Sequence, residues 1–127
     1  MTKTQYVIDG TECKTLKETA AAFTRALGLN FPWNGNLDAL NDILRGGFGT
    51  PEDGFVLIWK QSDLSRQGLG YNETVRWYEE NLQKCHPTNV STVKQKLSEA
   101  RNRRGTTVFD WLVEIIRGHQ NIELRLC

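Results

Sequence analysis

Cysteine and histidine are scarce, and this scarcity excludes several kinds of protein. The three cysteines, Cys13, Cys85 and Cys127, are odd in number, far apart and never arranged as Cys-x-x-Cys. We therefore expect neither a disulfide framework nor a structural zinc site, and we interpret them as free thiols in a reducing compartment. The two histidines, His86 and His119, flank no cysteine or carboxylate cluster at metal-ligand spacing. No metal and no cofactor is expected.

Long apolar runs and the common catalytic motifs are absent as well. No run is long enough to cross a bilayer, and the polar stretch 1–5 has no signal-peptide core. No phosphate-binding loop is present, because Gly46, Gly47 and Gly49 follow a predicted helix and precede a predicted strand. No serine stands in a nucleophile elbow, and candidates for acid–base catalysis are few. We therefore expect a cytoplasmic protein that is not an enzyme and does not bind membranes.

Charge is balanced over the whole chain but unevenly distributed along it. The formal net charge is +1. Residues 28–58 carry four acidic side chains and one basic one, whereas residues 93–105 carry five basic side chains and one acidic one. Each segment is either a solvated surface or a face for a partner of opposite charge.

Short β-prone runs alternate with helical segments along the chain. Strands that are connected through a helix usually run parallel, with helices packed against the sheet. The sequence therefore predicts an α/β fold in which helices cover a small three-stranded parallel sheet, within one domain of residues 1–127. The expected strands are 6–8, 55–59 and 122–126, and the expected helices are 16–27, 37–45, 62–67, 72–84, 91–104 and 107–117.

Capping residues indicate where several of these helices begin and end. Thr15 is followed three residues later by Glu18, which is the spacing of a capping box, and Gly28 is placed to end that helix. Asn36 is placed to cap the second helix, and Asn72 to cap the helix that begins near it.

The second predicted helix, 37–45, has an apolar side and an acidic side. Apolar residues recur at i, i+3 and i+7 from Leu37, which predicts a face turned toward the core. Asp38 and Asp42 lie one turn apart on the opposite side, where like charges repel at a cost of about a few tenths of a kcal/mol. The helix dipole favours Asp38 in the first turn, whereas Asp42 has Arg45 three residues on as a partner for an ion pair. From this helix alone, a solvated face and a binding face both remain open.

Two further side chains are candidates for contact with a partner. Trp33 lies in the loop before the acidic helix, and aromatic side chains often anchor interfaces, so we expect Trp33 to be exposed. Glu114 lies in the narrow polar strip of the strongly apolar helix 107–117. There it either contacts a partner or pairs with Arg117.

The segment 33–44, WNGNLDALNDIL, resembles the central segment of the barstar family, in which an aromatic loop leads into an Asn-Leu-Asp-Ala-Leu-x-Asp helix. An opening strand, turn and helix precede it, and the apolar strand after it ends in Lys60-Gln61, where the family has a similar basic residue and glutamine. The resemblance covers residues 6–61 and 107–126 and implies a barstar-like fold.

Barstar-like proteins are intracellular inhibitors that block the active site of a nuclease with acidic side chains. The resemblance therefore implies a bacterial immunity protein of a toxin–antitoxin pair, monomeric when free, whose partner is a cognate nuclease toxin and in particular a ribonuclease. By position, it implies that Asp42 is the phosphate-mimicking carboxylate and that Asp38 is its acidic neighbour. It also implies partner contacts at Gly46, after the helix, and at Glu114, on the last helix.

Several positions depart from the family pattern. The family's tryptophan between the two acidic contacts is Asn41 here, and its exposed loop tyrosine aligns with Pro32, so only Phe31 and Trp33 remain beside it. Glycine replaces the aromatic residue after the helix, with Phe48 one position later. These departures imply a different target with the same general mode of binding, and Asn41 is kept as a candidate contact.

Residues 64–104 replace a much shorter connection in the family, and we expect an insertion of one or two helices that covers the last helix. Its basic part, 93–104, has three interpretations: a solvated helix, a contact with an acidic region of the toxin, or direct binding of nucleic acid. The third defines an alternative function, a nucleic-acid-binding or regulatory module. We favour it least, because no aromatic side chain is interleaved among these charges.

Overall fold

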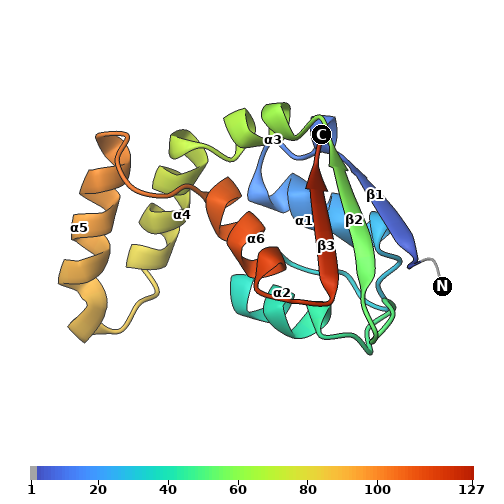
Figure 1. Ribbon diagram of the computed structural model, residues 1–127. Coiled ribbons are helices and arrows are strands. Elements are labelled where there is room, and N and C mark those ends of the chain that lie inside the picture. Colours follow the sequence, from blue (N-terminus) through green and yellow to red (C-terminus); the bar gives the residue numbers. More distant parts are fainter. Residues whose placement is uncertain (1–2) are drawn as a thin grey trace.

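The computed structural model describes residues 3–127 and confirms the predicted α/β class (Figure 1). The strands β1 (Gln5–Asp9), β2 (Phe55–Lys60) and β3 (Ile122–Leu126) form one parallel sheet in the order β1-β2-β3. The helices are α1 (Leu16–Ala26), α2 (Leu37–Leu44), α3 (Ser62–Gly68), α4 (Tyr71–Leu82), α5 (Val90–Arg101) and α6 (Val108–Arg117), with short 3-10 turns η1 (Gly10–Glu12) and η2 (Pro87–Asn89).

The register of the sheet separates a buried face from an open one. Tyr6 pairs with Leu57, which in turn pairs with Leu124, on the face that packs against the helices. One residue further on, Val7 pairs with Ile58 on the other face, and Val7 is 47% exposed. Because side chains alternate along a strand, one face of the sheet supplies the core and the other faces outward.

Trp59 of β2 joins the sheet to three helices. Its ring centroid lies 5.3 Å from that of Phe23 in α1 and 5.2 Å from that of Phe109 in α6. Its indole Nε1 donates a hydrogen bond of 2.8 Å to Ser65 Oγ of α3, and that hydroxyl donates to the Gly10 carbonyl at 3.0 Å. Full burial of a large apolar side chain contributes about 1.5–3 kcal/mol, so this contact set is a main source of stability in the sheet.

Two predicted helix starts are confirmed. Thr15 Oγ1 accepts a hydrogen bond from the Glu18 backbone N–H at 3.1 Å, and Asn36 Oδ1 accepts one from the Ala39 N–H at 2.9 Å. Each cap satisfies an N–H group that has no partner inside its own helix. The Asn36 cap fixes the start of α2, and so the direction in which the acidic side chains of α2 point.

Two other expectations about helix ends are wrong. Asn72 does not cap its helix, because α4 begins one residue earlier, at Tyr71, with Gly70 as the N-cap. Thr107 is the N-cap of α6 rather than its first residue. It forms a capping box with Asp110, whose Oδ2 accepts from the Thr107 N–H at 2.9 Å.

Helices α4 and α5, joined through η2, lie side by side at one end of the molecule, and we call them the hairpin (Figure 1). Helix α4 packs on α6 through an aromatic cluster in which Trp77 and Tyr78 both contact Trp111. Helix α5 packs on α4 and lies outermost, with Leu97 and Ala100 as its buried residues. The expected extra helices are thus present beside α6. That they form an insertion within one domain of residues 1–127 stays a prediction.

Candidate functional site

The polar side chains Asp38, Asn41 and Asp42 of α2, together with Arg45 at its C-cap, are called the α2 face. The opposite side of the helix is anchored in the core by three buried residues, Leu40, Ile43 and Leu44. This separation follows from the helical repeat, which places residues three and four apart on the same side. The buried side therefore holds the α2 face outward in a fixed orientation.

The two carboxylates of the α2 face are available to an external partner. Asp42 Oδ1 lies 3.5 Å from Arg45 Nη1, which confirms the expected pair, but both side chains are 68% exposed. Such an exposed pair contributes only about 0–1 kcal/mol, so a cation of a partner can replace Arg45 at little cost. Asp38 is exposed and forms no ion pair with any residue in the range 3–127.

The structure adds His119 to the α2 face, and sequence reasoning missed it. Its Nε2 lies 2.9 Å from Asn41 Oδ1, and because an amide oxygen only accepts hydrogen bonds, Nε2 carries the proton. Burial, and to a smaller extent the charge of Arg45, lower the pKa of His119 from 6.5. The ring is therefore neutral at neutral pH and does not offset the carboxylates.

Gly46 forms the turn that ends α2. Its φ is +100°, a conformation that side chains rarely adopt, and a Cβ there would lie 2.8 Å from Glu52 Cα. The backbone of the next loop thus packs directly against this residue. The turn and this close packing are sufficient to explain why residue 46 is glycine. They do not test the predicted contact between Gly46 and a partner.

An exposed aromatic pair lies beside the end of α2. The rings of Phe31 and Phe48 meet edge to face with centroids 5.4 Å apart, and they are 42% and 36% exposed. A backbone hydrogen bond of 2.9 Å from the Asn30 N–H to the Phe48 carbonyl joins their two loops. Exposed aromatic side chains are enriched at the centres of interfaces, so this pair is a candidate anchor.

The prediction that Trp33 is exposed is wrong. Trp33 is only 3% exposed, and its ring centroid lies 5.6 Å from that of Phe23 in the core. Its Nε1 donates to the Asn36 carbonyl at 2.8 Å, and its backbone N–H donates to Thr24 Oγ1 at 3.0 Å. Trp33 therefore supports the loop that leads into α2, and the exposed aromatic side chain of this loop is Phe31.

Glu114 is exposed on α6 but lies in a different hollow from Asp38. It lines a hollow of about 620 Å³ together with Arg66, Asp110 and Arg117, whereas Asp38 lines one between α2 and α4. The pair considered between Glu114 and Arg117 does not form, since no ion pair within residues 3–127 includes Glu114. Helices α2 and α6 pack against each other, but the two carboxylates line different hollows.

The chemistry of the α2 face suits the binding of cations. Its carboxylates are exposed, and the one imidazole beside it donates its Nε2 proton to Asn41. Among residues 3–127 no group of three or more His, Cys, Asp or Glu side chains could hold a metal ion. Within the same residues no helix is long and apolar enough to span a membrane.

A comparison with protein-family models places the chain in a known family. A family model described as Barstar (barnase inhibitor) matches residues 4–91, which is more than half of the chain. The match contains β1, β2 and the helices from α1 to α4, and so Asp38, Asn41, Asp42 and Arg45 of the α2 face. His119, α6 with Glu114 and the strand β3 lie outside it. It also contains residues 64–91 of the expected insertion. No curated protein matches the chain.

Proposed function

Because this chain belongs to the barstar family, whose members are inhibitors of barnase-like ribonucleases rather than enzymes, we propose that it is an immunity protein. In this proposal it binds a cognate ribonuclease toxin and blocks its active site. It acts in the cytoplasm of the bacterium that makes the toxin, is a monomer when free and has no catalytic activity of its own.

The exposed carboxylate of Asp42 is the observation that supports the proposal most. A ribonuclease holds the phosphates of RNA with cationic side chains, and a carboxylate can occupy the place of a phosphate. Charge-assisted pairs of this kind steer association and fix the orientation of the partners. Asp38 supplies a second carboxylate one turn away, and Arg45, which pairs with Asp42, is itself exposed and easily displaced.

The other predicted contacts take different parts in this proposal. Gly46 lets the partner approach the end of α2 closely. Asn41, held by His119, lies between Asp38 and Asp42 in the sequence of the helix. We assign to Phe31 the aromatic contact that sequence reasoning gave to Trp33. Glu114 then contacts the partner only where the toxin also reaches the outer surface of α6.

A pair of aspartate variants tests the proposal. Wild type, Asp42→Ala and the control Asp63→Ala are each titrated into barnase and a panel of ribonuclease toxin domains while RNA cleavage is followed. Asp63 is also exposed, carries the same charge and lies on α3, far from α2 in sequence. Removing one partner of a buried interfacial charge pair costs about 2–5 kcal/mol, and the barnase–barstar complex is one of the systems behind this range. Asp42→Ala should therefore weaken inhibition at least about thirtyfold.

Two results would count against the proposal. If wild type inhibits none of the ribonucleases, the inhibitor function is wrong. If inhibition occurs but Asp42→Ala and Asp63→Ala behave alike, the inhibitor function stands and the α2 face is not the site.

The alternative function uses the basic helix α5. Arg101, Arg103 and Arg104 are exposed and, within residues 3–127, unpaired, which favours contact with an anion. This alternative predicts retention of RNA with a steep salt dependence, lost in an Arg101→Ala, Arg103→Ala double variant and unchanged in Asp42→Ala. The absence of aromatic side chains among these charges makes the inhibitor the better supported function.

A further inference from the structure

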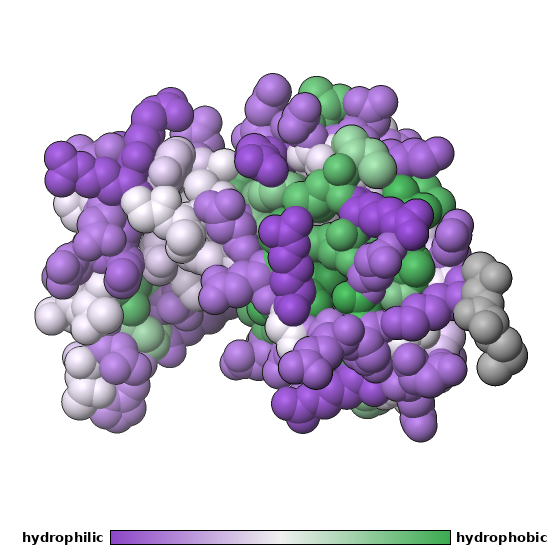
Figure 2. All heavy atoms as spheres, viewed as in Figure 1, coloured by the Kyte–Doolittle hydropathy of each residue, from purple (hydrophilic) through white to green (hydrophobic). Residues whose placement is uncertain are grey.

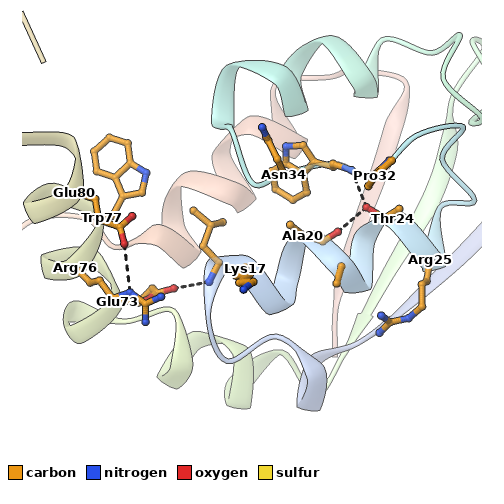
Figure 3. Close-up of a pocket in the computed structure, with 13 residues that line it drawn as sticks. Lys17, Ala20, Thr24, Arg25, Pro32, Asn34, Glu73, Arg76, Trp77 and Glu80 are labelled. Atoms are coloured by element: carbon orange, nitrogen blue, oxygen red, sulfur yellow. Dashed lines mark hydrogen bonds and ion pairs between the residues drawn. The ribbon is translucent and has the colours of Figure 1, made fainter. Parts of the chain in front are cut away.

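Two adjoining hollows lie along the side of α4 that is turned toward α1 and α2. One, of about 690 Å³, lies between α1, the loop 32–34 and α4 (Figure 3). The other, of about 510 Å³, lies between α2 and α4. Trp77 and Glu80 of α4 line both hollows, so the two adjoin along α4, and we call them together the α4 groove.

The α4 groove has an apolar floor and a charged rim. Its floor includes Leu16 and Ala20 of α1, Pro32 and Trp33 of the loop, and Trp77 of α4. Figure 3 shows side chains of α1 and α4 on the two sides of this space. Each hollow lies within the range of about 300–1,000 Å³ typical of pockets that enclose ligands, so the groove can receive side chains of a partner.

The α4 wall of the groove is held in place by buried contacts. The Glu73 carboxylate, only 8% exposed, accepts a hydrogen bond of 2.5 Å from the Leu16 N–H at the start of α1 and lies 3.7 Å from Arg76. Thr74 Oγ1 accepts a bond of 3.0 Å from the Val108 N–H at the start of α6. A groove with fixed walls loses little conformational freedom when it is filled, which favours binding.

The groove is continuous with the α2 face. Asp38 belongs to the α2 face and also lines the hollow between α2 and α4. A partner that covers Asp38 therefore reaches the rim of the α4 groove. At this end the rim carries the carboxylates of Asp38 and Glu80 and the ammonium group of Lys84. The larger hollow is lined by Lys17, Arg25 and Arg76, and Arg76 lies 3.7 Å from Glu80, so the acidic excess is confined to the end next to the α2 face.

We propose that the α4 groove is the second half of the nuclease-binding surface, where it receives a surface loop of the toxin. The loop would place a basic side chain beside Glu80 and Asp38 and an apolar side chain on the floor near Trp77. This inference rests on the proposed inhibitor function and extends it, since it makes α4 a determinant of which toxin is bound. Helix α4 lies within residues 4–91, which the family model matches, and its side chains that line the groove are the ones that would distinguish one toxin from another.

Neighbouring glutamates of α4 give a matched test. Glu79 and Glu80 are both exposed and adjacent, but only Glu80 lines the groove. Glu80→Lys and Glu79→Lys change the net charge equally, so a difference between them does not come from long-range attraction. It reports the contact at the groove or the loss of the Arg76–Glu80 ion pair. Binding to the ribonuclease that wild type inhibits, with barnase as the first probe, is measured at two salt concentrations. We expect Glu80→Lys to weaken the complex at least tenfold and Glu79→Lys less than twofold, since opposed like charges in an interface are strongly unfavourable.

Glu80→Lys also breaks the exposed ion pair between Arg76 and Glu80, whose N and O atoms are 3.7 Å apart. A second variant that keeps this pair is therefore needed. Ala21→Trp fills the larger hollow from the exposed side of α1 without removing a charge, and it should weaken the same complex at least fivefold. If Asp42→Ala weakens the complex while Glu80→Lys matches Glu79→Lys and Ala21→Trp matches wild type, the groove is not part of the interface and the inhibitor function stands. If wild type binds no ribonuclease, both proposals are wrong.

Discussion

Two regions of the molecule differ in how many large side chains they bury. One is the sheet with α1, α2 and α6, and the other is the hairpin of α4 and α5. The first region encloses large side chains that are completely buried, among them Trp59, Phe23 and Phe109. The hairpin has few buried residues, and in α5 they are only Leu97 and Ala100. In Figure 2 the apolar surface gathers over the strands and α6, while the hairpin end is mostly hydrophilic.

This difference shows how a surface element can be positioned without a core of its own. The hairpin is held by a few directional contacts from α4, namely the Glu73 carboxylate, the Thr74 hydroxyl and the ring of Trp77. Stability resides in the sheet region, and the geometry of the groove resides in these contacts. Substitutions in the two regions should therefore have different consequences, in magnitude and in kind.

Trp59→Ala should have the largest effect. It removes a fully buried ring that contacts two helices, and it leaves Ser65 Oγ without the indole donor. Loss of a buried tryptophan costs about 3–5 kcal/mol, which is a large part of the stability of a small domain. Urea unfolding followed by circular dichroism would measure this cost. A loss below 1 kcal/mol would mean that the core does not depend on β2 as described.

Glu73→Ala should have a smaller effect, concentrated on the hairpin. It leaves the Leu16 N–H without its acceptor, at a cost of about 1–3 kcal/mol for a buried unsatisfied group. Hydrogen exchange should show faster exchange in α4 and α5 than in β2, because the hairpin opens locally before the sheet region does. Glu79→Ala on the exposed side of α4 is the control. Equal changes in exchange in β2 and α5 would contradict the separation of the two regions.

His119 should give the smallest effect, a pH dependence that belongs to the sheet region. Its pKa is lowered in the folded state, so below about pH 6.5 the unfolded chain takes up the proton first and stability falls as the pH decreases. Above that pH this contribution is constant. In His119→Gln the unfolding midpoint should change less between about pH 7 and pH 5 than it does in wild type. In His86→Gln, at the exposed turn of the hairpin, the pH dependence of the midpoint should be that of wild type. The same slope in both variants would show that another group is responsible.

Local patterns predicted the elements of the fold well. The apolar run at 55–59 and the alternation at 122–126 become β2 and β3, because strand pairing needs little beyond β-prone residues and a buried face. Asn36 caps α2 as expected, since its partner is three residues away. The cap expected at Asn72 fails, because α4 begins one residue earlier, at Tyr71.

The features of the site that the sequence did not predict depend on contacts between distant parts of the chain. The exposure of Asp38 and Asp42 follows from helical periodicity and was predictable. The burial of Trp33 depends on Phe23 and Thr24 in α1, and nothing in the loop itself indicates it. His119 reaches Asn41 across 78 positions, a distance at which no local pattern signals a contact.

The all-parallel sheet also has a kinetic consequence. Its register joins Tyr6 to Leu57 and Leu57 to Leu124, so every strand pairing closes a long stretch of chain, and folds dominated by such pairings form in milliseconds to seconds rather than microseconds. The hairpin, with neighbouring helices and a short connection, can form far sooner on its own. Under the proposed immunity function, the chain would neutralise its toxin only after the slowest strand pairing is complete.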